Sequence, residues 1–555
     1  MPARRGPFFV MRSDTLSASE HPVSRGASRD RLARDAGLTG IATLTSRVLG
    51  LARDQVLAGF FGAGNDMDAF VVAFRVPNLV RDLFAEGAMS AAFVPTFTRE
   101  LSLKGKDNAW RLGNNVLNGL IIVTGALVVL GIVFARPLVT LYAGDFARVP
   151  GKLELTIQLA RIVLPFLTMV AIAAAAMGML NSLHHYFVPA LSPAMFNVAT
   201  IVGVVALTPL MPRVGLPPIM AVAIAALAGG FGQAAIQWPP LRREGFRYRP
   251  TFAPRDPALH RILVLMGPGT IGLAATQVNL FVNTVLATSQ GTGAASWLTY
   301  AFRLMYLPIG LFGASIGTAV LPAVSRHATA GDAASMRRTV SRGLALMLVL
   351  NVPATLGLIV LAAPIVQLLF ERGRFLAADT AATADALRLY AVGLAGYSAV
   401  RIASPTFYAI GESRVPAIVS GVAIAVNVSA SVLLVRAIGF AGLALGTSLA
   451  AIANAALLLW LLRRRLGGLD ERRLLGTLAK IVVSAIVMAI VAGALQRAMD
   501  RVVPGAGVAV RAFRLAFSIG GGLTALAIAA KITRVEEFDD VTSLVLGRVR
   551  KLLGP

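Results

Sequence analysis

Ionisable side chains occur inside the most apolar stretches of this chain, where they could bind a charged substrate. An ionised group at membrane depth costs about 2.5–3.5 kcal/mol, so each should face protein or water and serve a purpose. A guanidinium group stays charged at any physiological pH and pairs bidentately with oxyanions, which suits a phosphate or diphosphate. In the first two apolar stretches these residues are Arg47, Arg53, Asp54, Asp68, Arg75, Arg81, Asp82 and Glu86.

Their spacing predicts how they face one another. Asn78, Asp82 and Glu86 lie at i, i+4 and i+8, with Arg75 one further turn back, so one face of the second helix is a polar stripe. Arg47 and Arg53 are six residues apart. That places them roughly 9 Å apart along the helix axis and about 120° apart around it. Both could reach a wide cavity from different heights.

Simpler interpretations compete with substrate binding. Arg53 and Asp54 are adjacent and near a helix end, so a local ion pair or snorkelling would also explain them. Arg47 and Arg303, deep in otherwise apolar segments, could form structural pairs with neighbouring helices.

The composition is that of an integral membrane protein. Hydrophobic residues make up 56% of the 555 residues, charged residues 14%, and mean hydropathy is +0.73. The net charge of +25 does not indicate nucleic-acid binding, because the basic residues fall between apolar segments. With no cysteine and five scattered histidines, disulfides and thiolate metal sites are excluded and a zinc site is not indicated. The sequence predicts an all-α polytopic membrane protein rather than a soluble enzyme.

Apolar runs and Gly, Pro and charge punctuation predict about fourteen transmembrane helices. The connections that follow even-numbered helices carry 20 Lys and Arg, and those that follow odd-numbered helices carry 9. By the positive-inside rule, both termini are cytoplasmic. We predict a basic, disordered tail at 1–36, an N-lobe of six helices at 37–258, a C-lobe of six at 259–468, and two further helices with a cytoplasmic tail at 469–555.

An internal repeat relates the two lobes at an offset of 227 or 228 residues. Residues 73–75 match 301–303, and 83–84 match 311–312. Further matches join 137–139 with 364–366, Arg161 with Arg388, and 188–190 with 415–417. Each unit has an even number of helices, so both insert with the same orientation. Two such bundles around a central cavity are typical of an alternating-access transporter.

Two segments carry a resemblance to a known family. Residues 45–97, TSRVLGLARDQVLAGFFGAGNDMDAFVVAFRVPNLVRDLFAEGAMSAAFVPTF, resemble the amino-terminal signature of the MurJ (MviN) lipid II flippases, members of the MOP exporter superfamily. Residues 300–322, YAFRLMYLPIGLFGASIGTAVLP, resemble the family's eighth-helix segment. The resemblance covers roughly residues 37–531. It implies two six-helix lobes around a cavity and two carboxy-terminal helices that line a groove for a lipid tail.

The resemblance also implies a function. It is translocation of lipid II (undecaprenyl-diphosphate-MurNAc-pentapeptide-GlcNAc) across the bacterial inner membrane, driven by membrane potential, without cofactor, metal or catalytic residue. The coupling ion stays open. A monomer would suffice, with membrane lipid and cell-wall synthesis proteins as partners. The implied substrate-binding residues are Arg47, Arg53, Asp68, Arg81 and Arg303, and Glu86 matches the family pattern with a gating role. The polar stripe adds Arg75, Asn78 and Asp82 as cavity or gating residues.

Two departures and several alternatives accompany this resemblance. Phe302 and Tyr306 stand where some members have acids beside the eighth-helix arginine, so the counter-charge of Arg303 must come from elsewhere. The seventh and eleventh helices contain no Asp or Glu for a sodium site, and Asn279 and Asn283 could bind a cation or form interhelical hydrogen bonds. The alternatives are an O-antigen, polysaccharide or MATE-like drug exporter of the same superfamily, a polyprenyl-phosphate transferase and a non-transporting scaffold.

Overall fold

The computed structural model describes residues 23–81, 89–310, 314–539 and 542, and within them the regular structure is helical. Each of the fourteen predicted segments falls on one helix or on a pair of consecutive helices. Among the described residues, nine helical spans are long and apolar enough to cross a membrane, two of which join consecutive helices. Helices suit this solvent because each satisfies its backbone hydrogen bonds within one segment.

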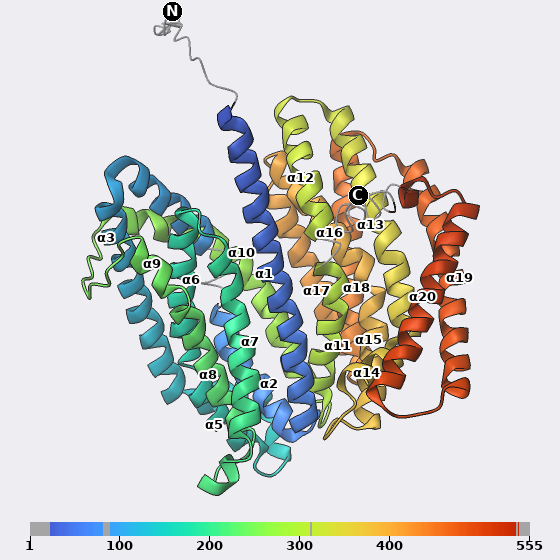
Figure 1. Ribbon diagram of the computed structural model, residues 1–555, viewed down its shortest axis with the longest axis horizontal. Coiled ribbons are helices and arrows are strands. Elements are labelled where there is room, and N and C mark those ends of the chain that lie inside the picture. The colour runs from blue at the N-terminus through green and yellow to red at the C-terminus, as the bar shows by residue number, and fades with distance from the viewer. Residues whose placement is uncertain (1–22, 82–88, 311–313, 540–541, 543–555) are drawn as a thin grey trace, which may run out of the picture.

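The N-lobe comprises the first nine α-helices, which lie on one side of the molecule (Figure 1). Its elements are α1 (Val23–Phe61), α2 (Asn65–Arg81), α3 (Met89–Val133), α4 (Ala135–Ala143), the 3-10 turn η2 (Gly144–Arg148), α5 (Lys152–Val163), α6 (Phe166–Ser182), α7 (Phe187–Leu207), the 3-10 turn η3 (Met211–Val214), α8 (Met220–Ala235) and α9 (Trp238–Arg243).

The C-lobe repeats this plan, and two further helices pack on its outer side. Its elements are α10 (Pro257–Thr288), α11 (Ala294–Pro308), α12 (Ala314–Thr329), α13 (Ala333–Val360), α14 (Ala362–Phe370), α15 (Ala377–Val392), α16 (Leu394–Ala409), α17 (Arg414–Ile438) and α18 (Ala441–Leu466), followed by α19 (Glu471–Val502) and α20 (Val508–Ile532). The short helices α4 and α14 begin and end 227 residues apart, as the repeat predicts. In Figure 1, α19 and α20 form the edge of the molecule farthest from the N-lobe.

Two predicted boundaries were wrong. The chain is helical from Val23, where we predicted a disordered tail to residue 36, because the charged stretch 23–36 continues α1 with helix-compatible Arg, Ala and Leu. We predicted a connection between the second and third apolar segments, near 69–98 and 113–142, but it is helical on both sides of Gly105, within α3. Gly105 breaks the helix with φ 80°, a conformation that favours glycine.

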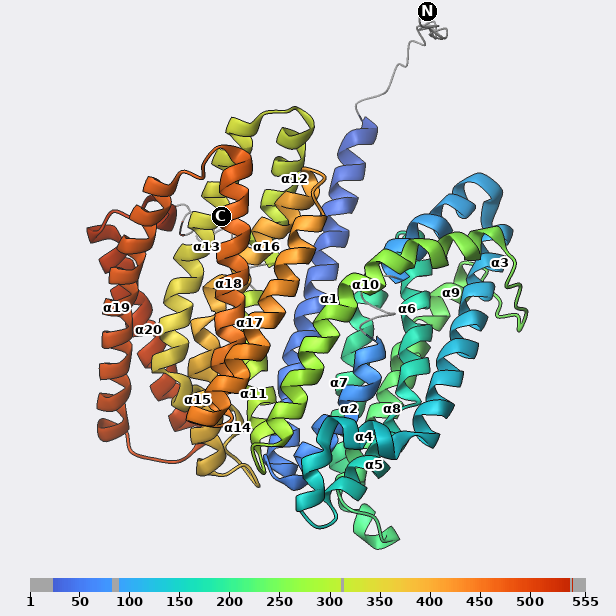
Figure 2. The ribbon, with the colours of Figure 1, turned by 180° about the vertical axis from the view of Figure 1, so that it is seen from behind.

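The two lobes are joined by α10 and the extended segment before it. Figure 2 shows α10 running from beside α3 in the N-lobe down to the region near α11. Three buried asparagines of α3, at positions 114, 115 and 118, hydrogen-bond the backbone of residues 247–253. The interlobe segment is therefore fixed to the N-lobe.

Removal of one of these asparagine side chains should lower the thermal stability of the protein. Asn115 donates to the Ala253 carbonyl at 2.9 Å and accepts from the Ala253 N–H at 2.8 Å. Asn115→Ala leaves both backbone groups without these partners, so we expect the apparent midpoint of thermal unfolding to fall by about 1–3 °C. Asn108→Ala is the control, because the hydrogen bond of Asn108 among the described residues stays within its own helix, to the Lys104 carbonyl. Equal midpoints for both variants would contradict this stabilising role of Asn115.

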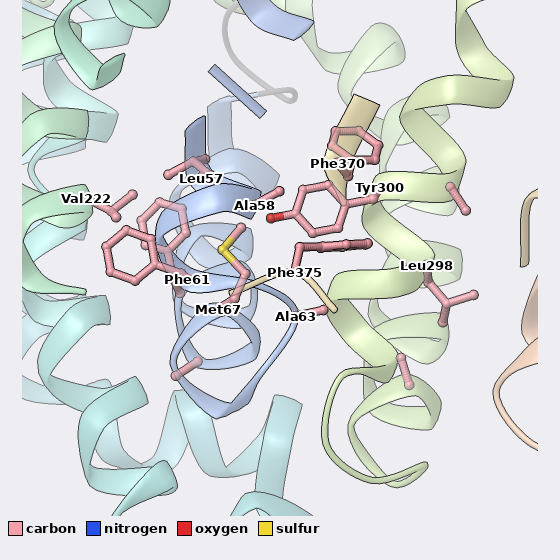
Figure 3. Packing of buried hydrophobic residues seen from close by; sticks show 14 of the residues in the cluster. Leu57, Ala58, Phe61, Ala63, Met67, Val222, Leu298, Tyr300, Phe370 and Phe375 are labelled. Atoms are coloured by element: carbon pink, nitrogen blue, oxygen red, sulfur yellow. The ribbon is translucent and has the colours of Figure 1, made fainter. Parts of the chain in front are cut away.

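The lobes pack together at the end of the molecule opposite the N terminus. Figure 3 shows Phe61 and Met67 of the N-lobe near Tyr300, Phe370 and Phe375 of the C-lobe. All five belong to one buried cluster, in which the Tyr300 ring lies 4.9 Å from Phe370 and 5.7 Å from Phe375 between centroids. This apolar contact closes one end of the interlobe space.

Candidate functional site

A cavity with about 1490 Å³ of empty volume lies between the lobes. Its walls come from α1, α2 and α7 of the N-lobe and from α10, α11, α15, α16 and α18 of the C-lobe. Arg53, Arg75 and Arg303 line it, whereas its described lining contains no carboxylate. Aromatic rings, among them Phe196 and Tyr397, cover much of the remaining wall. The cavity therefore combines cationic and aromatic surface.

One buried carboxylate links two of these arginines across the lobes. Asp54 Oδ1, on α1, accepts hydrogen bonds from Arg53 Nε at 3.2 Å and Nη2 at 2.9 Å. Arg303 Nη1, on α11, bonds the same oxygen. Asp54 is 4% exposed. It is the counter-charge of Arg303 that the sequence could not locate, and the local Arg53–Asp54 pair forms as well.

Both guanidinium groups keep donors for a ligand. Each has five N–H groups, and Asp54 takes two from Arg53 and one from Arg303. The Arg303 side chain is 42% exposed, against 14% for Arg53, whose Cζ lies 5.2 Å from the Phe196 ring centroid. The pair can hold an anion without first leaving Asp54.

Amide side chains form a second polar element of the cavity. The side-chain oxygens of Asn78, Gln277 and Asn283 are buried and have no hydrogen-bond partner among the described residues. All three residues line the cavity. Because an amide side chain carries both a donor and an acceptor, each group could accept from or donate to a ligand.

Of the remaining predicted residues, some line the cavity and others lie away from it. Arg75 lines the cavity beside Asn78, as the stripe on the second helix predicts, while Asp82 and Glu86 lie outside the described residues. Arg81 is the last residue of α2, half-buried and away from the cavity lining. Arg47 is exposed and also outside this lining; its guanidinium lies against Gly310 in the opposite lobe.

Asp68 is buried in a contact between the lobes, where it cannot reach a substrate in this state. It is 0% exposed and accepts from Lys152 Nζ at 2.9 Å, from Gly293 N at 2.7 Å, and from Ser296 N and Oγ at 3.1 and 2.7 Å. The predicted substrate-binding role therefore does not fit this conformation. The resemblance marked the residue but could not distinguish a substrate ligand from an interlobe contact.

Two polar contacts in the C-lobe were missed or left open by the sequence. Arg401 Nη2 donates to Tyr306 Oη at 2.6 Å, and Tyr306 follows Arg303 by three residues on the same helix. Arg401 lies in a predicted apolar helix, so the signal that singled out Arg47 was present there too. Asn427 donates to Asn279 and accepts from Ser431, which supports interhelical hydrogen bonding for Asn279.

The contact between Arg47 and Gly310 predicts a steric effect. A Cβ at position 310 would overlap Arg47 Nη1 and lie 3.0 Å from its Cζ. Gly310→Leu should therefore displace the guanidinium from the opposite lobe. If Arg47 acts at this place in the flippase function that the resemblance implies, growth rescue of a flippase-depleted strain should fall at least about tenfold, as expected when a charge-assisted contact is lost. Gly125→Leu, where a Cβ meets nothing within 4 Å, is the control.

Comparisons with known proteins show the family to which the chain belongs. The family model described as "Lipid II flippase MurJ" matches residues 57–519. The chain belongs to the lipid II flippase MurJ family. It is 35% identical over 455 residues to the probable lipid II flippase MurJ of Rhizobium meliloti (strain 1021), with 81% of this chain and 84% of the relative covered. It is also 35% identical over 428 residues to the lipid II flippase MurJ of Burkholderia cenocepacia, with 76% and 82% covered.

Solved structures place the MurJ-type fold within a wider group. A structure titled "Lipid II flippase MurJ, inward closed conformation" aligns with a TM-score of 0.74 at 26% identity, covering 89% of this chain and 98% of that one. An inward-facing MATE multidrug transporter of the MOP superfamily aligns at 0.65 with 18% identity, covering 78% and 99%. The second likeness is one of fold alone. The chain is thus a multi-pass membrane protein with the MurJ arrangement of lobes.

Proposed function

We propose that this protein moves lipid II from the cytoplasmic to the periplasmic leaflet of the bacterial inner membrane, with Arg53 and Arg303 holding its diphosphate. The observation that carries the proposal is the pair of guanidinium groups, one from each lobe, on the shared carboxylate of Asp54. Membership of the MurJ family and the names of the relatives support the substrate.

Diphosphate binding uses the donors that Asp54 leaves free. Phosphate oxygens accept charge-assisted, bidentate hydrogen bonds from guanidinium groups, which are about twice as strong as neutral ones. The diphosphate then bridges Arg53 and Arg303 and so bridges the lobes. Asn78, Gln277 and Asn283 offer hydrogen bonds to the sugar and peptide groups. Arg47 and Arg81 stay predicted contacts of a different conformation.

Translocation proceeds by alternating access. In the described state the lobes meet at the end opposite the N terminus, through Asp68 and the cluster around Tyr300. With both termini cytoplasmic, as the charge distribution predicts, this end is periplasmic and the cavity serves the cytoplasmic side. Parting of these contacts would release the head group outward. The lipid tail would stay in the bilayer beside α19 and α20, and membrane potential would supply the driving force.

Growth complementation tests the proposal. In a conditional flippase-depletion strain, the wild-type gene should restore growth, whereas Arg53→Ala and Arg303→Ala should not. Arg136→Ala is the matched control, since Arg136 is 60% exposed and, within the described part of the chain, pairs only with Glu154. Immunoblots of membranes verify equal amounts of each variant.

The outcomes separate the family alternatives. Failure of the well-expressed wild-type gene would favour another lipid-linked glycan as substrate, as in the polysaccharide branch of the superfamily. Rescue by both cavity variants would overturn the role of the arginines in diphosphate binding. Binding of purified lipid II to wild type and its loss in Arg303→Ala, measured by native mass spectrometry, gives the same test without a cell.

A further inference from the structure

A second group of arginines surrounds a pocket of the N-lobe that is separate from the interlobe cavity. This pocket has about 860 Å³ of empty volume and lies between α3 and the start of α10. Arg99, Arg111 and Arg261 line it. All three are exposed, and none has an ion pair or hydrogen bond among the described residues. Three guanidinium groups are thus available to one ligand.

The acidic residues of the pocket are already engaged. Glu100 pairs with Lys104 at 3.0 Å along the same helix. Asp256 caps α10 by accepting from the Ala258 N–H at 2.8 Å, and its other oxygen accepts from Asn115 at 3.4 Å. These carboxylates are therefore held by other partners, and the positive charge of the pocket is available to an external anion.

Apolar surface begins beside these charges. Leu103, which also lines the pocket, is 70% exposed. On α10, within a turn of Arg261, Leu263 is 57% and Val264 60% exposed. Exposed leucine and valine on a membrane-spanning helix mark a surface that faces lipid tails. The pocket therefore lies where the exposed surface of α10 passes from apolar to charged, and on a helix that crosses a membrane this change is expected near the lipid phosphate groups.

We propose that the pocket lined by Arg99, Arg111 and Arg261 binds the phosphate head group of an anionic membrane phospholipid. The acyl chains would lie along the exposed apolar residues of α3 and α10. A free phosphate ion would use the arginines alone and would gain nothing from this apolar surface, which is why we assign the lipid. The site is independent of the diphosphate site on Arg53 and Arg303.

Native mass spectrometry of the full-length protein tests this site. The probes are phosphatidylglycerol and phosphatidylcholine with identical acyl chains, with soluble glycerol phosphate as competitor. A basic residue at an anionic membrane surface contributes about fivefold in affinity, so the variant R99Q/R111Q/R261Q should bind phosphatidylglycerol at least about tenfold more weakly than wild type. Phosphatidylcholine binding should not change.

A matched variant controls for net charge. R326Q/R338Q/R414Q removes three exposed arginines from the C-lobe and should retain phosphatidylglycerol within about twofold of wild type, because distant charges are screened. Equal losses in both triple variants would overturn the pocket in favour of a general charge effect. Competition by glycerol phosphate at lipid-like concentrations would overturn the lipid assignment. Lysine replacements at the three positions, which preserve charge and solubility, should retain part of the affinity for phosphatidylglycerol. If neither the lysine nor the glutamine variant loses this affinity, the site is also overturned.

Discussion

Asp54→Asn is expected to abolish growth rescue while leaving a folded protein that still binds lipid II. The substitution keeps the size of the side chain but removes the charge that Arg53 and Arg303 share. The cavity becomes more positive, so diphosphate binding should be retained or strengthened. Release should fail, because no carboxylate then offsets the charge of the two guanidinium groups and the diphosphate is held too tightly. Complementation and lipid II binding, measured side by side, check this separation of binding from transport.

The same carboxylate should contribute to stability. Truncation of one partner of a fully buried ion pair costs about 3–5 kcal/mol, and the 42% exposure of Arg303 reduces this to about 2–3 kcal/mol for Asp54→Ala. A double-mutant cycle with Arg303→Ala isolates the pair, because the second truncation should cost less once Asp54 is gone.

A matched acid elsewhere serves as the control. Glu154→Gln removes a carboxylate that is 53% exposed and that, among the residues the structure describes, pairs only with Arg136, so growth and thermal stability should match wild type. Full growth rescue by Asp54→Asn would contradict the role of the Asp54 charge in weakening diphosphate binding for release. Loss of both binding and rescue would mean that Asp54 positions the arginines rather than releasing the substrate.

The sequence predicted the architecture well because membrane solvent imposes simple rules. Apolar segments long enough to cross a bilayer must be helices, and the offset of 227 residues that relates the lobes reappears in α4 and α14. The points inside these segments where one helix ends and the next begins were harder to predict. Pro165, for example, separates α5 from α6, although the segment is continuous in hydropathy.

The sequence predicted the chemical kind of the site, but only part of how its residues are arranged. The chemistry of arginine indicated an anion site, and Arg53, Arg75 and Arg303 do line one cavity. The sequence could not show that Arg53 and Arg303 share the carboxylate of Asp54. That contact depends on how α1 packs against α11, and 249 residues separate Asp54 from Arg303. The position of Asp68 could not be predicted either, since no spacing in the sequence indicates that the backbone of the opposite lobe hydrogen-bonds its carboxylate.

Asp68→Asn is expected to part the lobes at the end opposite the N terminus. The substitution leaves Lys152 buried, 3% exposed, with its charge unpaired and its Nζ 4.1 Å from the Phe146 ring centroid. An unpaired buried charge costs about 3–5 kcal/mol, and this penalty is relieved when the lobes separate and water reaches the lysine. The conformational equilibrium should therefore shift away from the described state.

The absence of cysteine from the chain makes this shift measurable with single thiols. Ala63→Cys places a probe at the interlobe contact, where Ala63 is 3% exposed. A membrane-impermeant maleimide should label this probe at least about tenfold faster in the Asp68→Asn background, as a shift of 1.4 kcal/mol or more requires. Ala175→Cys, in the N-lobe core at 0% exposure, should stay unlabelled and so distinguishes opening from unfolding.

Two companion variants separate the charge from the contact itself. Asn65→Ala removes an exposed interlobe hydrogen bond from Thr292 without leaving a buried charge, so labelling should change by less than about twofold. Lys152→Met added to Asp68→Asn removes the unpaired cation and should restore slow labelling, since apolar replacement of a buried ion pair is often neutral or stabilising. If labelling stays fast in that double variant, the hydrogen bonds from Gly293 and Ser296, rather than the buried charge, hold this end closed.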